Sequence, residues 1–267
     1  MGNSKLIIFN FQCQENRIIF FFAINNVKTK YMVNAQGWLD QNYPLEERKN
    51  VLELDFNNKN LEGHLDLSDF VNSEILDCSK NRLTSINLSN NKKIYWIDCS
   101  DNLLTEIDFS HQDPEKVEVI FIQNNNLSSR DLSCFSRFVN LGILFIGTDN
   151  KKKLQQDIYN RFYGSLKDLE DLDELQELNI NGTDIDNGLE SLPLDNLKKF
   201  YCASKRNGAG VEEIKSVLLL SEKKAESGSR GIIGKVKTYQ LYNHWQESVE
   251  EMEQAESLCL LSLREYL

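Results

Sequence analysis

The sequence is poor in the residues on which enzymes and metalloproteins most often rely. Its 267 residues include three prolines and three histidines, and its six cysteines form no CxxC pair. His64, His111 and His244 are far apart, and each is expected to be a solvated side chain. No nucleophile has a base at a recognisable spacing, and no cysteine or histidine cluster has the spacing of a zinc site. We therefore expect a protein that is not an enzyme, with no catalytic residue, no cofactor and no metal ion.

The chain also lacks long apolar runs and an excess of basic charge. Its longest unbroken apolar stretch, from Ile18 to Ile24, has seven residues, whereas a bilayer-spanning helix needs roughly 20. Thirty Lys and Arg stand against 41 Asp and Glu, a net charge of −11, and nucleic-acid binding draws on clustered basic residues. These deficits argue against a membrane partner and a nucleic-acid partner.

The six cysteines are spread too thinly for a secreted disulfide scaffold, which is shorter and richer in cysteine. Three of them, Cys78, Cys99 and Cys202, fall at one repeated position described below, which suggests buried thiols that act as small hydrophobic residues. We therefore expect a reducing, intracellular compartment and a cytoplasmic protein.

An internal repeat organises the middle of the sequence. The segments Leu76–Leu83 and Ile97–Leu104 share the pattern apolar-x-Cys-x-x-Asn-x-Leu. Extended upstream, the template becomes LxxLxLxxNxL and fits seven times, with steps of 22, 21, 23, 24, 34 and 22 residues between middle anchors. The anchors are Val51/Leu54/Phe56, Ser73/Leu76/Cys78, Ile94/Ile97/Cys99, Val117/Ile120/Ile122, Leu141/Leu144/Ile146, Leu175/Leu178/Ile180 and Leu197/Phe200/Cys202.

The pattern predicts one short strand per repeat, because alternating residues of a strand point to opposite sides. The polar position after the strand is expected to turn the chain and to bond neighbouring coils. Across the seven repeats that position is occupied by Lys59, Asn81, Asn102, Asn125, Asp149, Thr183 and Lys205. Since no single coil can bury its apolar residues alone, the coils must stack.

In these motifs the chain resembles a leucine-rich-repeat protein with short repeats of 21–24 residues. The fold class that this implies is an α/β repeat solenoid: a curved array with a parallel strand per repeat on the concave face, and helical N- and C-terminal caps. The segments Asn34–Pro44, Asn60–Gly63, Ile158–Leu166 and Phe200–Cys202 further resemble a large fungal leucine-rich-repeat family, whose arrays stand alone or are joined to kinase-like domains.

The predicted organisation has six parts: an N-terminal extension of undecided order (1–31), a helical N-cap (32–50), the array (51–206), a C-terminal cap helix (207–225), a linker (226–237) and an acidic amphipathic helix (238–267). The extension is either a hairpin or a partly disordered leader. The long fifth step, with Leu154, Ile158, Phe162 and Leu166 four residues apart, predicts an inserted helix. The last helix either folds back on the array, which we favour, or docks to a partner.

Residues that alternate with the anchors are expected to point outward on the concave face. Five of them form one apolar patch in mid-array, where a polar sheet face is the default, and such patches often mark interaction sites. The alternative is that a terminal segment covers the patch. The predicted protein-binding residues are Ile75, Trp96, Val119, Phe121, Ile143, Phe145, Tyr201, Asp55, Asp77 and Asp98.

The three aspartates would stack about 5 Å apart on neighbouring strands. Two unit charges at that distance repel by roughly 0.8 kcal/mol in bulk water, which a basic partner would relieve. The simpler interpretation, which we favour, is repetition of a duplicated coil.

The sequence thus predicts a non-enzymatic module that binds a polypeptide on the concave face of a solenoid. Residues 51–206 carry 17 basic and 27 acidic side chains, a net charge of −10, which favours a protein partner with a basic rim. The alternative is a regulatory or targeting arm of a kinase-like or other signalling enzyme supplied in trans. The pattern leaves the partner's identity, the pathway and the oligomeric state open.

Overall fold

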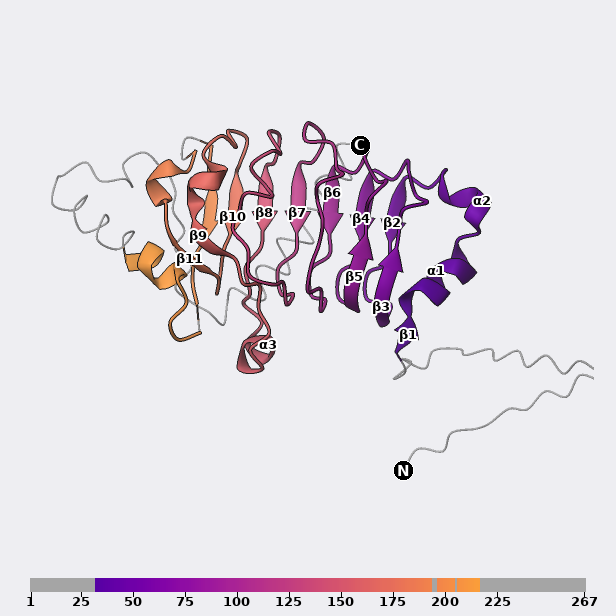
Figure 1. Ribbon diagram of the computed structural model, residues 1–267, viewed down its shortest axis with the longest axis horizontal. Coiled ribbons are helices and arrows are strands. Elements are labelled where there is room, and N and C mark those ends of the chain that lie inside the picture. The colour runs from indigo at the N-terminus through magenta and orange to yellow at the C-terminus, as the bar shows by residue number, and fades with distance from the viewer. Residues whose placement is uncertain (1–31, 194–195, 205, 217–267) are drawn as a thin grey trace, which may run out of the picture. The chain divides into compact units, whose positions relative to one another are not determined.

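The computed structural model describes residues 32–193, 196–204 and 206–216 (Figure 1). The chain divides into two compact units, residues 1–31 and residues 32–267, and every described residue belongs to the second. The predicted N-terminal extension, the linker at 226–237 and the helix at 238–267 therefore lie outside the described residues.

Seven short parallel strands form the principal sheet (Figure 1). In spatial order they are β2 (Glu53–Asp55), β4 (Ile75–Asp77), β6 (Trp96–Asp98), β7 (Val119–Phe121), β8 (Ile143–Phe145), β10 (Glu177–Asn179) and β12 (Lys199–Tyr201). The middle residues pair in one register from Leu54 to Phe200. Each strand is centred on a predicted middle anchor, so the predicted seven-coil parallel solenoid is confirmed.

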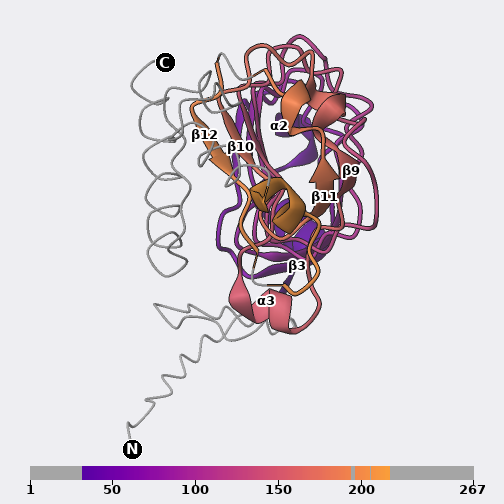
Figure 2. The ribbon, with the colours of Figure 1, turned by 90° about the vertical axis from the view of Figure 1, so that its left-hand side faces the viewer.

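The returning halves of the coils contain little α-helix. Strands β1 (Val33–Asn34), β3 (Leu61–Asp66) and β5 (Arg82–Asn87) form a parallel three-stranded sheet, and β9 (Tyr163–Ser165) pairs with β11 (Asp184–Asn187). Short 3-10 turns occur at Leu166–Leu169 and Leu189–Ser191. Figure 2 shows β10 and β12 on one side of the coils and β9 and β11 on the other. The hydrophobic core fills the space between these two sides.

The predicted anchors form this core. Of the 21 anchor side chains, 20 are buried and Val51 is half-buried. Ser73, the single polar anchor, is also buried, and its hydroxyl donates a hydrogen bond to the backbone oxygen of Val51 at 3.0 Å. A buried hydroxyl is tolerated when it is hydrogen-bonded, so the polar anchor preserves the stack. On the return side the core also contains Phe70, Phe109, Phe135, Phe138 and Phe162.

A ladder of buried asparagines joins successive coils. The side-chain Nδ2 of Asn102 donates to the backbone oxygen of Cys78, one coil earlier, at 2.9 Å, and its Oδ1 accepts from the backbone nitrogen of Leu83 at 2.9 Å. Asparagine suits this position because its amide both donates and accepts, and each bond satisfies a backbone group that the turn leaves unpaired. The ladder consists of Asn81, Asn102, Asn125 and Asn160.

The long fifth step corrects two predictions. The expected helix from Leu154 to Leu166 does not form: helix α3 spans only Lys151–Gln155, with the side chain of Asn150 as its N-cap. Asp157 follows with a left-handed φ of 57°, a conformation that does not continue a right-handed helix.

The second correction concerns the residue that turns the fifth coil, because Asn160 takes the ladder position that the template gave to Asp149. Its Nδ2 donates to the backbone oxygens of Ile122 and Ile146. Middle anchor and ladder asparagine are five residues apart in the fourth coil (120 to 125) and 16 in the fifth (144 to 160). The fifth coil therefore contains an insertion of 11 residues between its middle anchor and its ladder asparagine. Without this insertion, the 34-residue step to the next middle anchor becomes an ordinary step of 23 residues.

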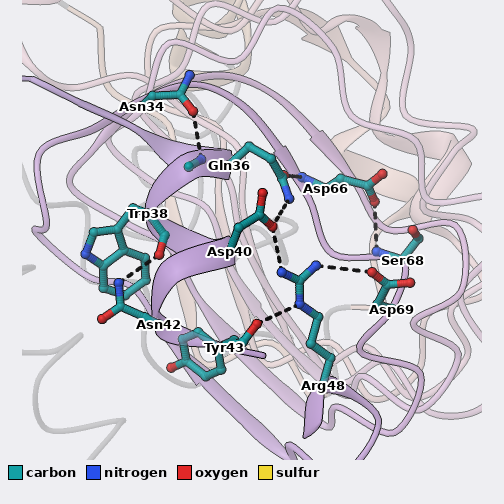
Figure 3. Close-up of polar contacts among 11 residues, drawn as sticks. Asn34, Gln36, Trp38, Asp40, Asn42, Tyr43, Arg48, Asp66, Ser68 and Asp69 are labelled. Carbon is teal, nitrogen blue, oxygen red and sulfur yellow. Dashed lines mark hydrogen bonds and ion pairs between the residues drawn. The ribbon is translucent and has the colours of Figure 1, made fainter. Parts of the chain in front are cut away.

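The segment before the first coil contains two short helices, α1 (Ala35–Asn42) and α2 (Leu45–Arg48). Ala35 and Leu39 are fully buried in the same core as the first coils. Arg48, only 6% exposed, joins both helices to the first coil through ion pairs with Asp40 at 2.6 Å and Asp69 at 3.2 Å (Figure 3). The hydrogen bond from Arg48 lowers the pKa of Asp40, and one from Gln36 adds to the effect.

At the other end, residues 211–216 are helical, and Val211 and Ile214 are buried in the core. The rest of the predicted C-terminal cap, to residue 225, lies outside the described residues. The capping role of both end segments stays a prediction.

Candidate functional site

The outer side of the seven-stranded sheet is the face that we predicted to be concave, and we call it the strand face. The middle residue of each strand points inward to the core, so the two flanking residues point outward. On most coils the repeat leaves the identity of these flanking residues free, because stacking uses the inner side. The identities of the flanking residues are therefore set by requirements other than the stacking of the coils.

Apolar side chains gather on the strand face into a hydrophobic cluster that is separate from the core. We call it the strand-face cluster; its five buried members are Trp96, Val119, Phe121, Phe145 and Tyr201. Ile75, Tyr95 and Ile143 are partly buried and pack against it. The structure thus brings together all seven apolar residues that the sequence predicted for this surface. It adds Tyr95, which the alternation of strand residues did not mark because it lies just before β6.

Aromatic rings run through this cluster from coil to coil. Ring centroids lie 5.5 Å apart for Trp96 and Phe121, 5.1 Å for Phe121 and Phe145, and 5.8 Å for Phe145 and Tyr201. All three pairs are edge-to-face, a geometry that contributes about 0.5–1.5 kcal/mol per pair beyond the area buried. The result is a continuous aromatic row from β6 to β12.

Among the described residues, polar atoms of β6 and of the residues that follow it are buried on the strand face without a hydrogen-bond partner. They are Nε1 of Trp96 and Oγ of Ser100, which follows β6. Leaving such a group unpaired costs about 1–3 kcal/mol. A bound main chain that formed hydrogen bonds with this N–H donor and this hydroxyl would remove that cost. Trp96 itself is only 3% exposed.

The predicted aspartates have a local structural role. Asp55, Asp77 and Asp98 each accept, at Oδ1, the backbone N–H two residues further on, at 2.9–3.0 Å. These are Asx turns, in which the carboxylate fixes the exit of the chain from the strand. Asp55 is exposed, Asp77 is half-buried and Asp98 is 4% exposed. A role of these residues in binding a protein stays a prediction.

Charge is distributed unevenly along the strand face. Its first coils carry the carboxylates of Glu53, Asp55 and Asp77, whereas Lys199 on β12 forms a 2.8 Å ion pair with Glu177 on β10. Near the cluster, burial raises the pKa of Tyr95, and the charges of Glu74, Glu118 and Glu53 raise it further. A neutral phenol beside carboxylates is thus maintained to unusually high pH, and the N-terminal half of the face is acidic.

The described residues show no other arrangement with an evident chemistry. Within 32–193, 196–204 and 206–216, no group of three or more His, Cys, Asp and Glu side chains could hold a metal ion. In the same ranges no helix is long and apolar enough to cross a membrane. Cys78, Cys99, Cys134 and Cys202 are free thiols. Burial raises the pKa of Cys202 to about 12 and that of Cys134 to about 11, so both remain protonated near neutral pH.

Comparisons with known proteins return solved structures alone. No family model matches the chain, and no curated protein matches it. An internalin (inlF) from Listeria monocytogenes is 15% identical with a TM-score of 0.38, over 67% of this chain and 50% of that one. The functional domain of InlJ from Listeria monocytogenes, which includes a cysteine ladder, is 17% identical with a TM-score of 0.34, over 63% and 48%. The chain spans about half the length of either structure.

The assignment of the architecture depends on the strand register and the asparagine ladder described above. The fold is a leucine-rich-repeat solenoid. The solenoid presents an acidic N-terminal stretch and an apolar middle on its strand face.

Proposed function

We propose that this leucine-rich-repeat solenoid is a protein-interaction module that binds a polypeptide across the strand-face cluster. The observation that carries the proposal is the cluster itself. Interaction sites are enriched in contiguous apolar surface with aromatic side chains at the centre. Trp96, Phe121 and Phe145 provide such a centre on three neighbouring strands.

The polar atoms of the face also suit a polypeptide. A main-chain carbonyl laid across β6 would accept the hydrogen bond that Nε1 of Trp96 has available, and a main-chain N–H would donate to Oγ of Ser100. The carboxylates on β2 and β4 would attract basic side chains that flank the apolar contact. The proposed ligand is therefore an apolar segment with Lys or Arg at one end, in a cytoplasmic partner.

Peptide selection on the intact chain tests this proposal. Displayed peptides of about twelve residues would be selected on the full-length protein, and the affinity of the selected peptides measured by fluorescence anisotropy. A contact at an interface centre contributes about 2 kcal/mol or more. We therefore expect Trp96→Ser combined with Phe121→Asp to weaken binding more than tenfold.

A matched double variant controls for the introduced polarity. Val139 and Tyr163 are large, 49% and 47% exposed, and lie away from the strand face, so Val139→Ser with Tyr163→Asp should leave affinity unchanged. Unchanged affinity of a folded Trp96→Ser, Phe121→Asp protein would rule out this surface as the binding site.

A second proposal is a regulatory or targeting arm for a kinase-like enzyme supplied in trans. It is supported by the resemblance of Asn34–Pro44 and Ile158–Leu166 to a family in which such arrays occur beside kinase-like domains. Capture of a kinase-like domain by the intact chain, unaffected by the substitutions at Trp96 and Phe121, would favour this second function over the first.

A further inference from the structure

The strand-face cluster is more deeply buried than an outward-facing row of side chains should be. Trp96 and Phe121 are each 3% exposed, Phe145 is 4%, Val119 is 5% and Tyr201 is 9%. Neighbours on the same sheet cover the flanks of such side chains, but their tips stay open unless a second layer lies above them. Among the described residues, the apolar contacts of the cluster come from the strand face itself.

The sequence outside the described residues contains one segment suited to form that layer. Residues 238–267 contain neither Gly nor Pro, and their pattern predicts a single helix. Steps of 4, 4, 3 and 7 residues place its apolar positions on one side of that helix. These seam positions are Leu241, Trp245, Val249, Met252 and Cys259.

The dimensions of the segment and of the face agree. From Leu241 to Cys259 is 18 residues, or about 27 Å of helix. The apolar row runs from Ile75 on β4 to Tyr201 on β12, five strand intervals and about 24 Å. The 12 residues of the predicted linker (226–237) can extend over roughly 40 Å, so the segment can reach every strand of the sheet.

The division of the chain distinguishes this segment from the N-terminal one. Residues 32–267 form one compact unit, whereas residues 1–31 form another. We propose that residues 238–267 lie across the strand-face cluster of their own chain as a tethered, displaceable occupant of the binding surface. The segment occupies the same face on which the proposed function places the partner, so its role as a regulator of binding rests on that proposed function.

A tethered occupant acts as a competitor. A short flexible linker gives an effective concentration in the millimolar range, so a partner must displace the segment before it binds. Charge assists displacement, because residues 238–267 carry six acidic side chains and one basic side chain, a net charge of −5. The acidic segment is repelled by Glu53, Asp55 and Asp77, whereas a basic partner is attracted to the same carboxylates.

Cross-linking in the intact chain tests the occupancy. Ile143 is half-buried and packs against the cluster, so p-benzoylphenylalanine at this position would sample whatever lies above it. We expect cross-links to residues 238–267 of the same chain, in a product that migrates as a monomer. Cross-links elsewhere, cross-links between two chains, or their absence would overturn the proposal.

Peptide binding by full-length variants tests the competition. Trp245→Asp with Met252→Asp disrupts the apolar seam, and we expect it to strengthen binding of the selected peptides at least tenfold and to increase fluorescence of an apolar dye. Asn243→Asp with Gln254→Asp adds the same two charges on the opposite side of the predicted helix and should change neither. Equal behaviour of the two variants would contradict the competition.

The two measurements separate this inference from the proposed function. Peptide binding that is lost on Phe121→Asp but unchanged by the seam variant, without cross-links to 238–267, would refute the inference and leave the function intact. Cross-links to 238–267, with no peptide selected by either the wild-type chain or the seam variant, would refute the function and leave the segment as a permanent layer.

Discussion

The inner and outer sides of the seven-stranded sheet are built from the same strands but follow different rules. On the inner side, the middle residue of every strand is apolar and at most 3% exposed, from Leu54 to Phe200. On the outer side, the flanking residues change from exposed carboxylates on β2 to buried aromatic rings on β7 and β8. Stacking requires the inner side to be uniform, whereas the outer side varies from coil to coil. The proposed binding function therefore rests on this variation and not on the uniform inner side.

Breaking the ladder on the inner side should have the largest effect. Replacing Asn102 with Ala leaves the buried backbone N–H of Leu83 without its side-chain acceptor. It also removes one of the two side-chain hydrogen bonds to each backbone oxygen of Cys78 and Cys99, which keep Asn81 and Asn125 as donors. The unsatisfied N–H costs about 1–3 kcal/mol and each lost hydrogen bond about 1 kcal/mol, so we expect a loss of about 3 kcal/mol or more in the free energy of unfolding. Urea denaturation followed by circular dichroism would measure it.

Asn90 provides the control for that experiment, because it is exposed and lies in a turn. Asn90→Ala should change the free energy of unfolding by less than about 0.5 kcal/mol. Equal losses at Asn102 and Asn90 would show that the ladder does not hold the coils together.

Two neighbouring residues of β7 compare the two sides directly. Ile120 points into the core and is fully buried, whereas Val119 belongs to the strand-face cluster and is 5% exposed. Ile120→Ala should cost about 3 kcal/mol, because a closely packed core leaves a cavity. Val119→Ala removes a smaller group from the outer side of the sheet, and we expect about 1 kcal/mol. Denaturation of both variants checks the difference, and a larger cost at Val119 would contradict the distinction between the core and the strand-face cluster.

The smallest expected effect is a dependence of stability on pH from turns on the return side. A hydrogen bond from the Ser110 backbone lowers the pKa of the Asp108 carboxyl group below the ordinary 3.8. A hydrogen bond from the Ser133 hydroxyl lowers the pKa of the Asp131 carboxyl group in the same way. At Asp66, burial raises the pKa, but hydrogen bonds from Ser68 and then Asn87, with the charge of His64, outweigh it.

A carboxyl group whose pKa is lowered in the folded state stabilises the fold at pH values above its pKa in the unfolded chain. This stabilisation is lost when the group is protonated. We therefore expect the melting temperature to be level above about pH 5 and to decline as the pH falls through 3.8 toward the lowered values. Thermal unfolding between pH 3 and pH 6 measures this decline. Asp131→Asn should reduce it, whereas an unchanged profile would exclude a contribution from that turn.

The periodic anchors made the solenoid predictable, because burial of one residue in the middle of each strand is a local pattern repeated seven times. The same reasoning failed at the fifth coil. There the spacing of Leu154, Ile158, Phe162 and Leu166 imitates a helix, while Phe162 and Leu166 belong to the core of the array. The ladder position of Asn160 was hidden by the 11-residue insertion, which the template could not place.

The candidate site was predictable in composition and less so in its contacts. Strand alternation identified Trp96, Phe121 and Phe145 as neighbours on one face, since register follows from the repeat. It did not identify Tyr95, whose position before the strand gives no alternation signal. Nor did it reveal the turn bonds of Asp77 and Asp98, because an acidic column is equally compatible with binding and with local structure.

The sequence by itself determined that the chain stacks in short coils with a parallel strand in each, because only stacking buries two apolar faces per repeat. It also determined that the acidity lies on the array. The tertiary structure decided which asparagine closes each coil, how Lys153 of the insertion reaches the backbone oxygen of Asn102, and how deeply the aromatic row is buried. These three features depend on contacts between residues far apart in the chain. The spacing of residues along the sequence does not specify the distances between residues of different coils.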